Sequence, residues 1–267
     1  MTGVLLTRHR GSDAKPPRIL RIAFTALRRM RVGAVVAAVL AVSACSSGSA
    51  PRVGQAIGSG PESSAAVPAD VARYVLPNLV TIEARHSSGV TTTGSGIRVP
   101  IDGIVVTTAH VVGDAAEVWL TLRDGSRRLG SVLGTAPELD VAAVQLPGST
   151  DVAVPVNVGD ALAKLKTGDG LFVVCSTVSG PTVTATKVAA LSRLVQINQG
   201  PAVAILEMNA AIDPPCSGGS LVNTTGDVLG LTTTVAVRPV DDNVTTNSFA
   251  IPVPVSRNAV FRIILNR

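Results

Sequence analysis

The chain has 267 residues, of which 46% are hydrophobic and 15% are charged, so it can bury a sizeable core and is not a disordered protein. Its formal net charge of +5 comes from the leader: residues 1–31 hold eight Lys or Arg and one Asp, a net +7, and residues 32–44 hold no charge, which leaves −2 for residues 45–267. With 2% aromatic residues and no basic cluster beyond Arg127 and Arg128, the body of the chain excludes a nucleic-acid-binding protein.

The leader has the pattern of an export signal. A basic segment precedes eleven uncharged and mostly apolar residues, 32–42. This run is too short to span a bilayer and fits the apolar part of a secretory signal. We therefore predict a signal peptide over residues 1–44. An alternative translation start is Met30.

The signal ends in small residues followed by Cys45, which resembles the bacterial lipobox, whose cysteine becomes a lipidated N-terminus after cleavage. The resemblance implies a lipoprotein that is exported and anchored through Cys45 to the outer face of the bacterial cytoplasmic membrane. The alternative is an unrelated cysteine beside a signal that is cleaved elsewhere. Residues 45–69 are rich in Ser, Gly, Ala and Pro and predict a flexible tether, which would reach roughly 25 Å as a Gly/Ser-like coil.

From Asp70 onward the sequence predicts an all-β domain. Short runs of Val, Ile, Thr and Leu are separated by Gly, Asp and Pro, and they fall into two batches, which favours two barrels in tandem over about 70–157 and 158–252. The strands expected in the first batch are 79–84, 96–99, 104–108, 116–122, 127–133 and 141–146. Those expected in the second batch are 171–176, 182–191, 194–197, 203–208, 220–223, 228–237 and 248–251.

The one convincing helix in the sequence is terminal and covers residues 255–265. Its apolar residues fall on one face at helical spacing, so we expect it to pack across the second barrel. The residues of this face are Val255, Ala259, Val260, Ile263 and Ile264.

Two cysteines remain once Cys45 is set aside, namely Cys175 and Cys216. An even remainder in an exported chain favours one disulfide, because the compartment is oxidising. The alternative is two unrelated buried thiols.

The octet of residues 213–220, DPPCSGGS, contains a serine followed by two glycines between apolar runs. This layout presents a nucleophile, here Ser217, on a tight turn beside backbone N–H groups. The same residues also form ordinary hairpin turns.

Ser217 would need a base and an orienting carboxylate, because serine is not nucleophilic at neutral pH. His110 follows an apolar strand, whereas His86 lies in an expected exposed turn and is interpreted as a rim residue. Asp140 is flanked by apolar residues at the head of a strand, a position that buries a carboxylate. Alone, His110 could be a core histidine and Asp140 a turn residue, but their joint occurrence with Ser217 favours a triad.

Several stretches match one known pattern in order: GSGI at 94–97, DGIVVTTAHVV at 102–112, VWL at 118–120, LDVA at 139–142, SGGSLVN at 217–223 and FAIP at 249–252. On these residues the chain resembles the trypsin-like serine proteases, and most closely the HtrA (DegP-like) family, over about residues 77–262. The resemblance implies a chymotrypsin-like double β-barrel with a C-terminal helix. It also implies that His110 is the general base, Asp140 its orienter and Ser217 the nucleophile at the seam between the barrels.

The chain departs from the family at three points. A PDZ module usually follows the protease domain, and we expect none here. Cys216 replaces a common Asn, and Cys175 stands where a loop near the active serine usually has Gly, so the resemblance favours a Cys175–Cys216 disulfide that pins the nucleophile turn to the second barrel. The oxyanion turn, Pro215, Cys216 and Ser217, has proline in place of a glycine whose N–H is one of two oxyanion donors. Proline has no N–H, and the loss of one donor costs on the order of 10²–10³ in turnover.

Two functions follow. The first is a membrane-anchored, exported serine endopeptidase of HtrA-like type that cleaves peptides or unfolded proteins of the cell envelope, with its activity reduced by Pro215. The alternative is a catalytically impaired pseudoprotease lipoprotein that binds peptides or a protein partner through the same cleft.

The resemblance places the substrate pocket beside the nucleophile turn and the following barrel strand. Small and weakly polar walls would select small or aliphatic P1 residues. The expected wall residues are Ala211, Ile212, Thr232, Thr233 and Thr234. We expect no cofactor, and we expect no metal because the histidines and cysteines lack metal-ligand spacing.

Overall fold

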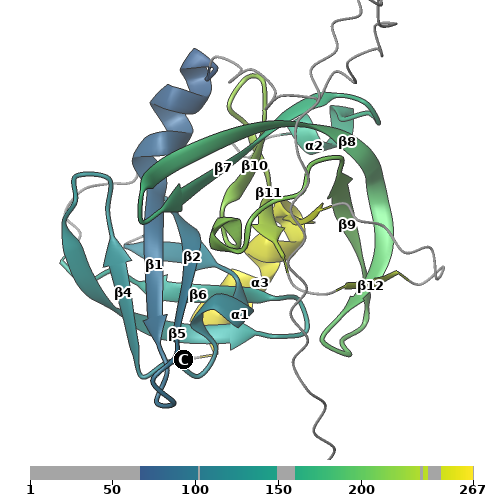
Figure 1. The fold of residues 1–267 in the computed structure, drawn as a ribbon. Coiled ribbons are helices and arrows are strands. Elements are labelled where there is room, and N and C mark those ends of the chain that lie inside the picture. Colours follow the sequence, from purple (N-terminus) through teal and green to yellow (C-terminus); the bar gives the residue numbers. More distant parts are fainter. Residues whose placement is uncertain (1–66, 102, 149–159, 235–236, 240–247, 267) are drawn as a thin grey trace, which may run out of the picture. The chain divides into compact units, whose positions relative to one another are not determined.

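The computed structural model describes residues 67–101, 103–148, 160–234, 237–239 and 248–266 (Figure 1). The expected signal peptide, Cys45 and the tether up to residue 66 lie outside the described residues. No helix in the described part of the chain is long and apolar enough to cross a membrane.

Six antiparallel strands form the first barrel, as the sequence predicted (Figure 1). Their order is β1-β2-β3-β6-β5-β4, and the pairing of β1 with β4 closes the barrel. The strands are β1 (Leu79–Arg85), β2 (Thr91–Arg98), β3 (Ile104–Thr107), β4 (Glu117–Thr121), β5 (Arg127–Ala136) and β6 (Val141–Gln145).

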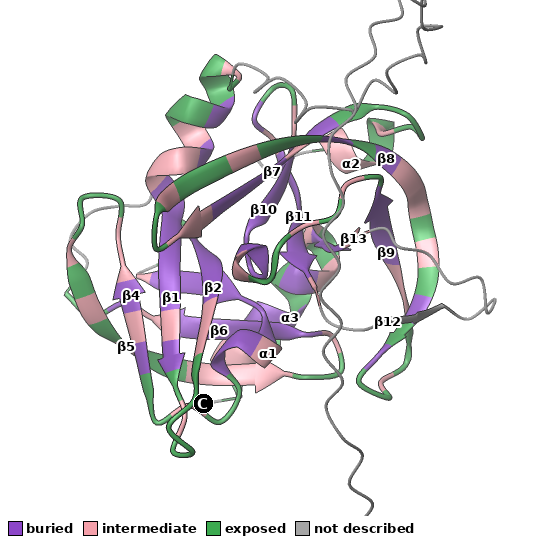
Figure 2. Ribbon diagram, viewed as in Figure 1, coloured by how far each residue is buried: buried purple, intermediate pink, exposed green. Residues whose placement is uncertain are grey.

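Strands β3 and β6 are apolar on both faces because they separate two hydrophobic cores. In β3, Val105 packs inside the first barrel, whereas Ile104 and Val106 belong to a core shared with the second barrel and the terminal helix. In β6, Val144 and Ala143 divide in the same way. This explains their continuous apolar sequence, since a strand alternates its side chains between two faces. Figure 2 shows β6 buried along most of its length.

The second sheet has the order β12-β8-β7-β10-β11-β13-β9, and a further pairing of β8 with β9 joins its ends into a ring. The short strand β12 is attached outside this ring, to β8. The strands are β7 (Gly170–Thr177), β8 (Gly180–Ile197), β9 (Ala202–Met208), β10 (Ser220–Asn223), β11 (Val228–Thr233), β12 (Val237–Pro239) and β13 (Ser248–Pro252).

The strands differ most from the sequence prediction at three places. The runs 182–191 and 194–197 form one strand, β8, because register shifts near residues 188–193 let it bend without ending. The run 228–237 instead contains β11, which ends at Thr233, and reaches only the first residue of β12. Strand β2 begins at Thr91, five residues earlier than expected, because its polar threonines pair with the outer end of β1.

The structure also contains more helical segments than the sequence predicted. Helix α3 (Val253–Leu265) is the expected terminal helix, but the structure has short helical segments elsewhere. A segment of three to five residues is too short to show the helical period of 3.6, so the sequence pattern could not predict it. These segments are η1 (Val71–Val75), η2 (Leu76–Asn78), α1 (Ala109–Val112), α2 (Ala161–Lys164) and η3 (Pro214–Cys216).

Helix α3 packs on both barrels rather than on the second alone. It contacts β11 and β13 of the second barrel and also β5 and β6 of the first. Ala259 and Val260 of the helix lie in the shared core together with Val106 of the first barrel and Leu231 of the second. The helix therefore closes the core between the barrels.

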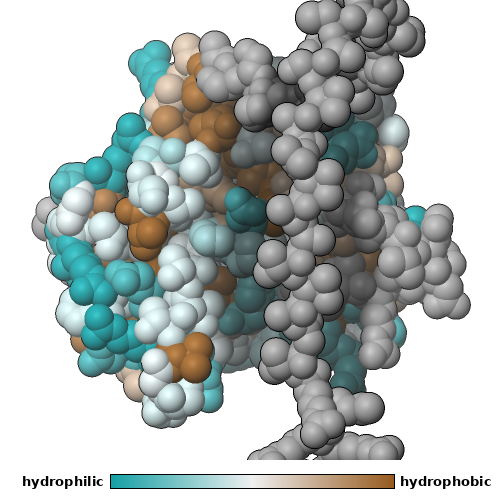
Figure 3. Space-filling view, in the orientation of Figure 1, coloured by the Kyte–Doolittle hydropathy of each residue, from teal (hydrophilic) through white to brown (hydrophobic). Residues whose placement is uncertain are grey.

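The outer face of the first barrel is polar, and in Figure 3 the surface over β4 and β5 is mostly teal and white. Arg127 forms an ion pair with Glu83 at 2.9 Å, and its guanidinium lies 4.6 Å from the centroid of the Trp119 ring. Arg128 donates to the carbonyl oxygen of Gly148 at 2.8 Å. The one basic pair of the body is therefore engaged within the fold.

A charge at the buried face of α3 should destabilise the whole domain. Ala259 is 1% exposed, so the substitution Ala259→Asp should lower the free energy of unfolding by about 3 kcal/mol or more, because it buries an unpaired carboxylate. The matched control is Asn258→Asp, which adds the same charge at the preceding exposed position. Urea denaturation of both variants checks this, and equal unfolding midpoints would contradict the packing of α3.

Candidate active site

His110 stands on a short helical turn directly after a buried strand. Strand β3 ends at Thr107, Thr108 is extended, and α1 begins at the next residue. The other residues of α1 are buried, whereas the side chain of His110 is 28% exposed. The apolar neighbours thus anchor the turn and leave the imidazole at the surface of the first barrel.

Asp140 is fully buried, and three hydrogen-bond donors surround its carboxylate. The backbone N–H of His110 donates to Oδ1 at 3.0 Å, and His110 Nδ1 lies 3.0 Å from Oδ1 and 2.9 Å from Oδ2. Thr233 Oγ1, from the second barrel, donates to Oδ2 at 2.7 Å. A carboxylate that is 0% exposed needs such partners, because an unpaired buried charge is very costly.

This arrangement assigns the proton on the imidazole. Because Nδ1 of His110 lies against a carboxylate, we place the proton on Nδ1, which leaves Nε2 as an acceptor. An imidazole in this state can act as a general base. The structure therefore brings His110 and Asp140 into contact, and their catalytic roles stay predictions.

A hairpin of the second barrel supports the turn that carries the buried carboxylate. Asn198 and Gln199 have φ values of +47° and +63°, and the N–H of Gly200 closes a type I′ turn between β8 and β9. Asn198 Nδ2 donates to the carbonyl oxygen of Pro137 at 3.1 Å. A Cβ on Gly200 would lie 2.7 Å from the carbonyl oxygen of Glu138, so a side chain there would push the two turns apart.

Ser217 follows the turn η3 and precedes a loop that only glycine can form. Gly218 has φ of +82°, a conformation that other residues rarely adopt. A Cβ on Gly218 would also collide with Ser95 O and Thr107 Oγ1 of the first barrel. The loop therefore passes directly against the first barrel, which buries Ser217 to 0% exposure.

The backbone N–H and the hydroxyl of Ser217 are both engaged within the chain. Its N–H donates to the carbonyl oxygen of Pro214 at 3.0 Å, and its Oγ lies 2.6 Å from Thr234 Oγ1. Among the described residues, no hydrogen bond joins Ser217 to His110. In a working serine hydrolase this N–H donates to the oxyanion and this Oγ donates to the imidazole. We name residues 214–217 in this arrangement the closed turn.

The ring of Pro215 restricts how the closed turn can open. To swing the Pro214 carbonyl away from Ser217, the peptide plane between Pro214 and Pro215 must rotate, which changes ψ of the first residue and φ of the second in opposite senses. The ring of Pro215 holds φ near −65°, so this rotation is blocked unless neighbouring torsions also change. Glycine at the same position would permit it. Pro215 thus has no N–H of its own to donate, and it keeps the Ser217 N–H on the carbonyl oxygen of Pro214.

Ser95 of β2 connects the closed turn to both barrels. Its N–H donates to Ser217 O at 2.8 Å, and its Oγ lies 2.9 Å from Pro215 O and 2.8 Å from Ser176 O. The Ser95 hydroxyl has one proton, so it donates to only one of these carbonyls at a time. The sequence analysis did not identify Ser95. Its position between two glycines of a strand was the available signal, because such glycines mark a close approach of another backbone.

Cys216, in the middle of the closed turn, is joined to Cys175 of β7 by a disulfide. The two Cα atoms lie 5.1 Å apart, and both cysteines belong to the core of the second barrel. The structure thus contains the disulfide that the family resemblance implied, not two separate thiols. It covalently attaches the closed turn to the second barrel.

Two of the expected pocket residues make contacts inside the fold. Thr232 is 0% exposed and Thr233 is 1% exposed. The Thr232 hydroxyl donates to the carbonyl oxygen of Cys216, and the Thr233 hydroxyl donates to Asp140. Sequence reasoning missed this role of Thr233. The available signal was that a buried carboxylate needs more donors than one imidazole provides.

Of the other expected pocket residues, Thr234 is the one that contacts Ser217. Thr234 contacts the Ser217 hydroxyl, Ile212 packs against the core of the second barrel, and Ala211 is exposed. The P1 preference for small or aliphatic residues stays a prediction.

His86 forms a separate pair at the rim of the first barrel. Its Nδ1 lies 2.9 Å from Asp114 Oδ1, and its Nε2 lies 3.0 Å from Thr92 Oγ1. The hydrogen bond from His86 lowers the pKa of the exposed Asp114 carboxyl below its usual value. Both ring nitrogens are therefore engaged outside the triad.

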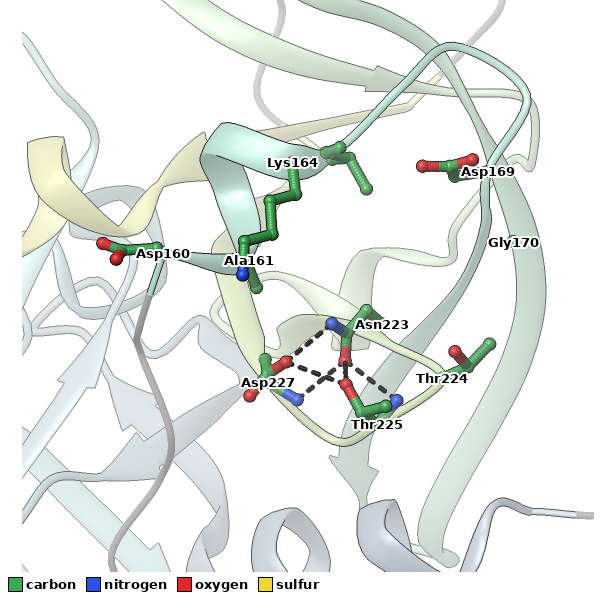
Figure 4. Close-up of a pocket in the computed structure, with 10 residues that line it drawn as sticks. Asp160, Ala161, Lys164, Asp169, Gly170, Asn223, Thr224, Thr225 and Asp227 are labelled. Atoms are coloured by element: carbon green, nitrogen blue, oxygen red, sulfur yellow. Dashed lines mark hydrogen bonds between the residues drawn. The ribbon is translucent and has the colours of Figure 1, made fainter.

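A cavity of about 520 Å³ between α2 and the β10–β11 turn is lined by none of the triad residues (Figure 4). Figure 4 shows the side chains of Asn223, Thr225 and Asp227 pointing toward one another. Asp227 Oδ2 accepts hydrogen bonds from Asn223 Nδ2 and Thr225 Oγ1, both at 2.8 Å. The polar groups of this turn satisfy each other, and the described residues contain no group of three or more His, Cys, Asp or Glu that could hold a metal ion.

Removal of the Thr233 hydroxyl should destabilise the fold. Thr233→Val should lower the free energy of unfolding by about 1–3 kcal/mol at neutral pH, because the buried Asp140 carboxylate loses one donor. Thr233→Ser keeps the hydroxyl and should stay within about 1 kcal/mol of the unmodified chain. Equilibrium urea denaturation measures both. A Thr233→Val variant as stable as the serine variant would show that this hydrogen bond contributes nothing.

Comparison with known proteins places this site in a family. A family model described as the trypsin-like peptidase domain matches residues 94–231, more than half of the chain. HhoA of Synechocystis sp., named as a serine protease, is 36% identical over 163 residues, which cover 60% of this chain and 40% of that protein. A periplasmic serine endoprotease of DegP-like type from Pseudomonas putida is 34% identical over 164 residues, 61% of this chain and 33% of that protein. The chain thus spans only about a third to two fifths of these relatives.

Solved structures show the same fold. The HtrA-type protease AlgW with a tripeptide aligns with a TM-score of 0.62 at 24% identity, covering 73% of this chain and 62% of that one. AlgW with a decapeptide aligns with a TM-score of 0.61 at 22% identity, covering 73% and 66%. The chain belongs to the trypsin-like peptidases, and its barrels form a protease domain of the HtrA (DegP-like) type.

Proposed function

We propose that this chain is an exported serine endopeptidase with low intrinsic turnover. One observation carries the proposal: the buried Asp140 carboxylate holds the His110 imidazole through Nδ1, and Thr233 supports the carboxylate from the second barrel. This is the half of a serine-protease site that prepares the base. A buried carboxylate behind a partly exposed imidazole is a costly arrangement for a chain that needs only a stable fold.

The proposed reaction starts with a rearrangement. Ser217 Oγ exchanges its contact with Thr234 for one with His110 Nε2, which takes the serine proton as Oγ attacks the substrate carbonyl. Asp140 stabilises the imidazolium that forms. His110 then gives the proton to the leaving amine, and water hydrolyses the acyl-enzyme by the same route.

The closed turn limits this reaction. The developing oxyanion has no N–H at Pro215, and the Ser217 N–H reaches it only after leaving the carbonyl of Pro214. Loss of a single donor lowers turnover by on the order of 10²–10³. We therefore expect slow cleavage in the native chain.

A non-catalytic peptide-binding protein is the second candidate, and the closed turn itself favours it. Pro215 blocks the rotation that would free the Ser217 N–H, and Ser95 Oγ lies against the carbonyl of Pro215 from the first barrel. A site locked in this way would bind peptides through the seam between the barrels without cleaving them.

The substrates proposed are peptides and unfolded proteins of the cell envelope. AlgW, a structural neighbour, is described with a tripeptide and with a decapeptide, and the Pseudomonas relatives are named as periplasmic endoproteases. We propose that this chain is exported as well and is held at the membrane through lipid on Cys45.

Fluorophosphonate labelling distinguishes the two candidates. The native chain should label slowly at Ser217, and Ser217→Ala should not label. Pro215→Gly should label on the order of 10²-fold faster, because glycine restores an N–H and allows the peptide plane to rotate. The rate is read from gel fluorescence over time.

The matched control is Pro214→Ala, which leaves Pro215 in place and should label no faster than the native chain. No Ser217-dependent labelling in the native chain, together with labelling in Pro215→Gly, would overturn the endopeptidase proposal and leave the peptide-binding protein. Equal rates in Pro215→Gly and the native chain would instead refute the role of the closed turn.

Lipidation is tested separately in a bacterial host. Radiolabelled palmitate should be incorporated into the native chain and absent from Cys45→Ala, because the thioether forms at that sulfur. Cys175→Ala is the control and should incorporate palmitate as before. Incorporation that persists in Cys45→Ala would refute the anchor without bearing on the activity.

A further inference from the structure

A second cavity lies at the edge of the core shared by the barrels, beneath helix α3. Its volume is about 200 Å³, and its walls come from the β2–β3 connection, from β10 and β11 and from one face of α3. The apolar lining includes Ile97 and Val106 of the first barrel, Leu231 of the second and Val260 of the helix. Neither His110 nor Ser217 lines it, so it is distinct from the proposed active site.

The cavity is open at a rim that carries exposed apolar side chains. Ile101 is 37% exposed and Phe261 is 46% exposed, and both line the cavity. A cavity of about 150 Å³ with apolar walls binds benzene, so this one can take an apolar group of somewhat larger size. A long lipid chain would exceed the volume.

Two hydrogen-bond donors in the wall have no partner among the described residues. The Ser220 side chain is 0% exposed, and its Oγ has no hydrogen bond. The exposed guanidinium of Arg257 makes no ion pair with any described residue. The third polar residue of the lining, Ser256, is different, because its hydroxyl donates to the carbonyl of Val253 at 3.2 Å.

These features select the class of ligand. An unsatisfied buried hydroxyl is costly, and an unpaired cation beside an apolar cavity attracts an anion. A ligand that offers acceptors to both donors and an apolar tail to the walls combines these requirements. An amine would be repelled by Arg257, and a neutral alcohol would leave the charge of Arg257 unpaired.

We propose that this cavity binds a small carboxylic acid with a short alkyl tail. The tail fills the space under α3, and the carboxylate accepts hydrogen bonds from Arg257 at the rim and from Ser220 in the wall. The proposal is independent of the proposed peptidase activity, because none of the triad residues takes part.

The test is an NMR titration of the full chain with labelled Ile and Val methyl groups. Hexanoate should shift the methyl signals of Ile97, Val106 and Val260 with saturation, and affinity should rise about fourfold per CH₂ from butanoate to hexanoate. The rise should stop by decanoate, because the cavity is then filled. Hexan-1-ol and hexylamine should bind at least fivefold more weakly than hexanoate.

Variants test the two parts of the site. Arg257→Gln should weaken hexanoate binding about fivefold. The control is Arg262→Gln, which should leave the affinity unchanged, because Arg262 is exposed on the same helix and does not line the cavity. Val260→Phe should abolish the saturable shifts by filling the cavity. Ser220→Ala keeps the cavity and should weaken binding at least twofold, so it decides the matter if Val260→Phe fails to fold.

Three results would overturn the proposal. One is the absence of saturable shifts with any acid of the series. Another is that the native chain binds hexanoate and hexan-1-ol with equal affinity, or that Arg257→Gln and Arg262→Gln bind hexanoate with equal affinity. The third is binding of N-acetyl-alanyl-leucine more than tenfold tighter than hexanoate, because the occupant would then be a peptide C-terminus and not a small acid.

Discussion

The burial of one charge organises the structure. Asp140 belongs to the first barrel, but its carboxylate is satisfied only when Thr233 of the second barrel donates to it as well. The site can therefore form only where the two barrels meet, and correct docking of the barrels is a condition for a correctly held imidazole. The hairpin at Asn198 supports the same turn from the second barrel. Stability and the preparation of the base thus depend on the same contacts.

The two halves of the site are in different states. On the imidazole side, the geometry matches what a base requires. On the Ser217 side, the backbone N–H donates to the carbonyl oxygen of Pro214 and the hydroxyl contacts Thr234, so both groups are engaged within the chain. Ser95 strengthens this arrangement, because it donates to Ser217 O and lies against Pro215 O. In the proposed mechanism the base is therefore held permanently, whereas an oxyanion is bound only after rearrangement.

The strands, the tandem barrels and the contact of His110 with a buried Asp140 could be predicted from the sequence because they depend on local patterns. The short runs of Val and Ile indicated buried strands, and the glycines after Ser217 indicated a tight turn. The missed features depend on contacts between distant residues: Ser95 and Pro215 are 120 positions apart, and Asp140 and Thr233 are 93 apart. Helix α1 could not be predicted because a segment of four residues is too short to show a helical period. The single long strand β8 could not be predicted because a β-bulge interrupts the strand pattern in the sequence in the same way as a strand end.

The disulfide sets the speed at which the closed turn can change. A surface loop rearranges within nanoseconds to microseconds, because it moves without its neighbours. The turn here is not such a loop, since Cys216 is bonded to Cys175, and Cys175 lies within β7, which is paired on both edges with β8 and β10. Any opening that displaces Cys216 must disturb a central strand of the second barrel. Exchange that displaces Cys216 therefore belongs to the slow collective motions, on the order of microseconds to milliseconds or slower.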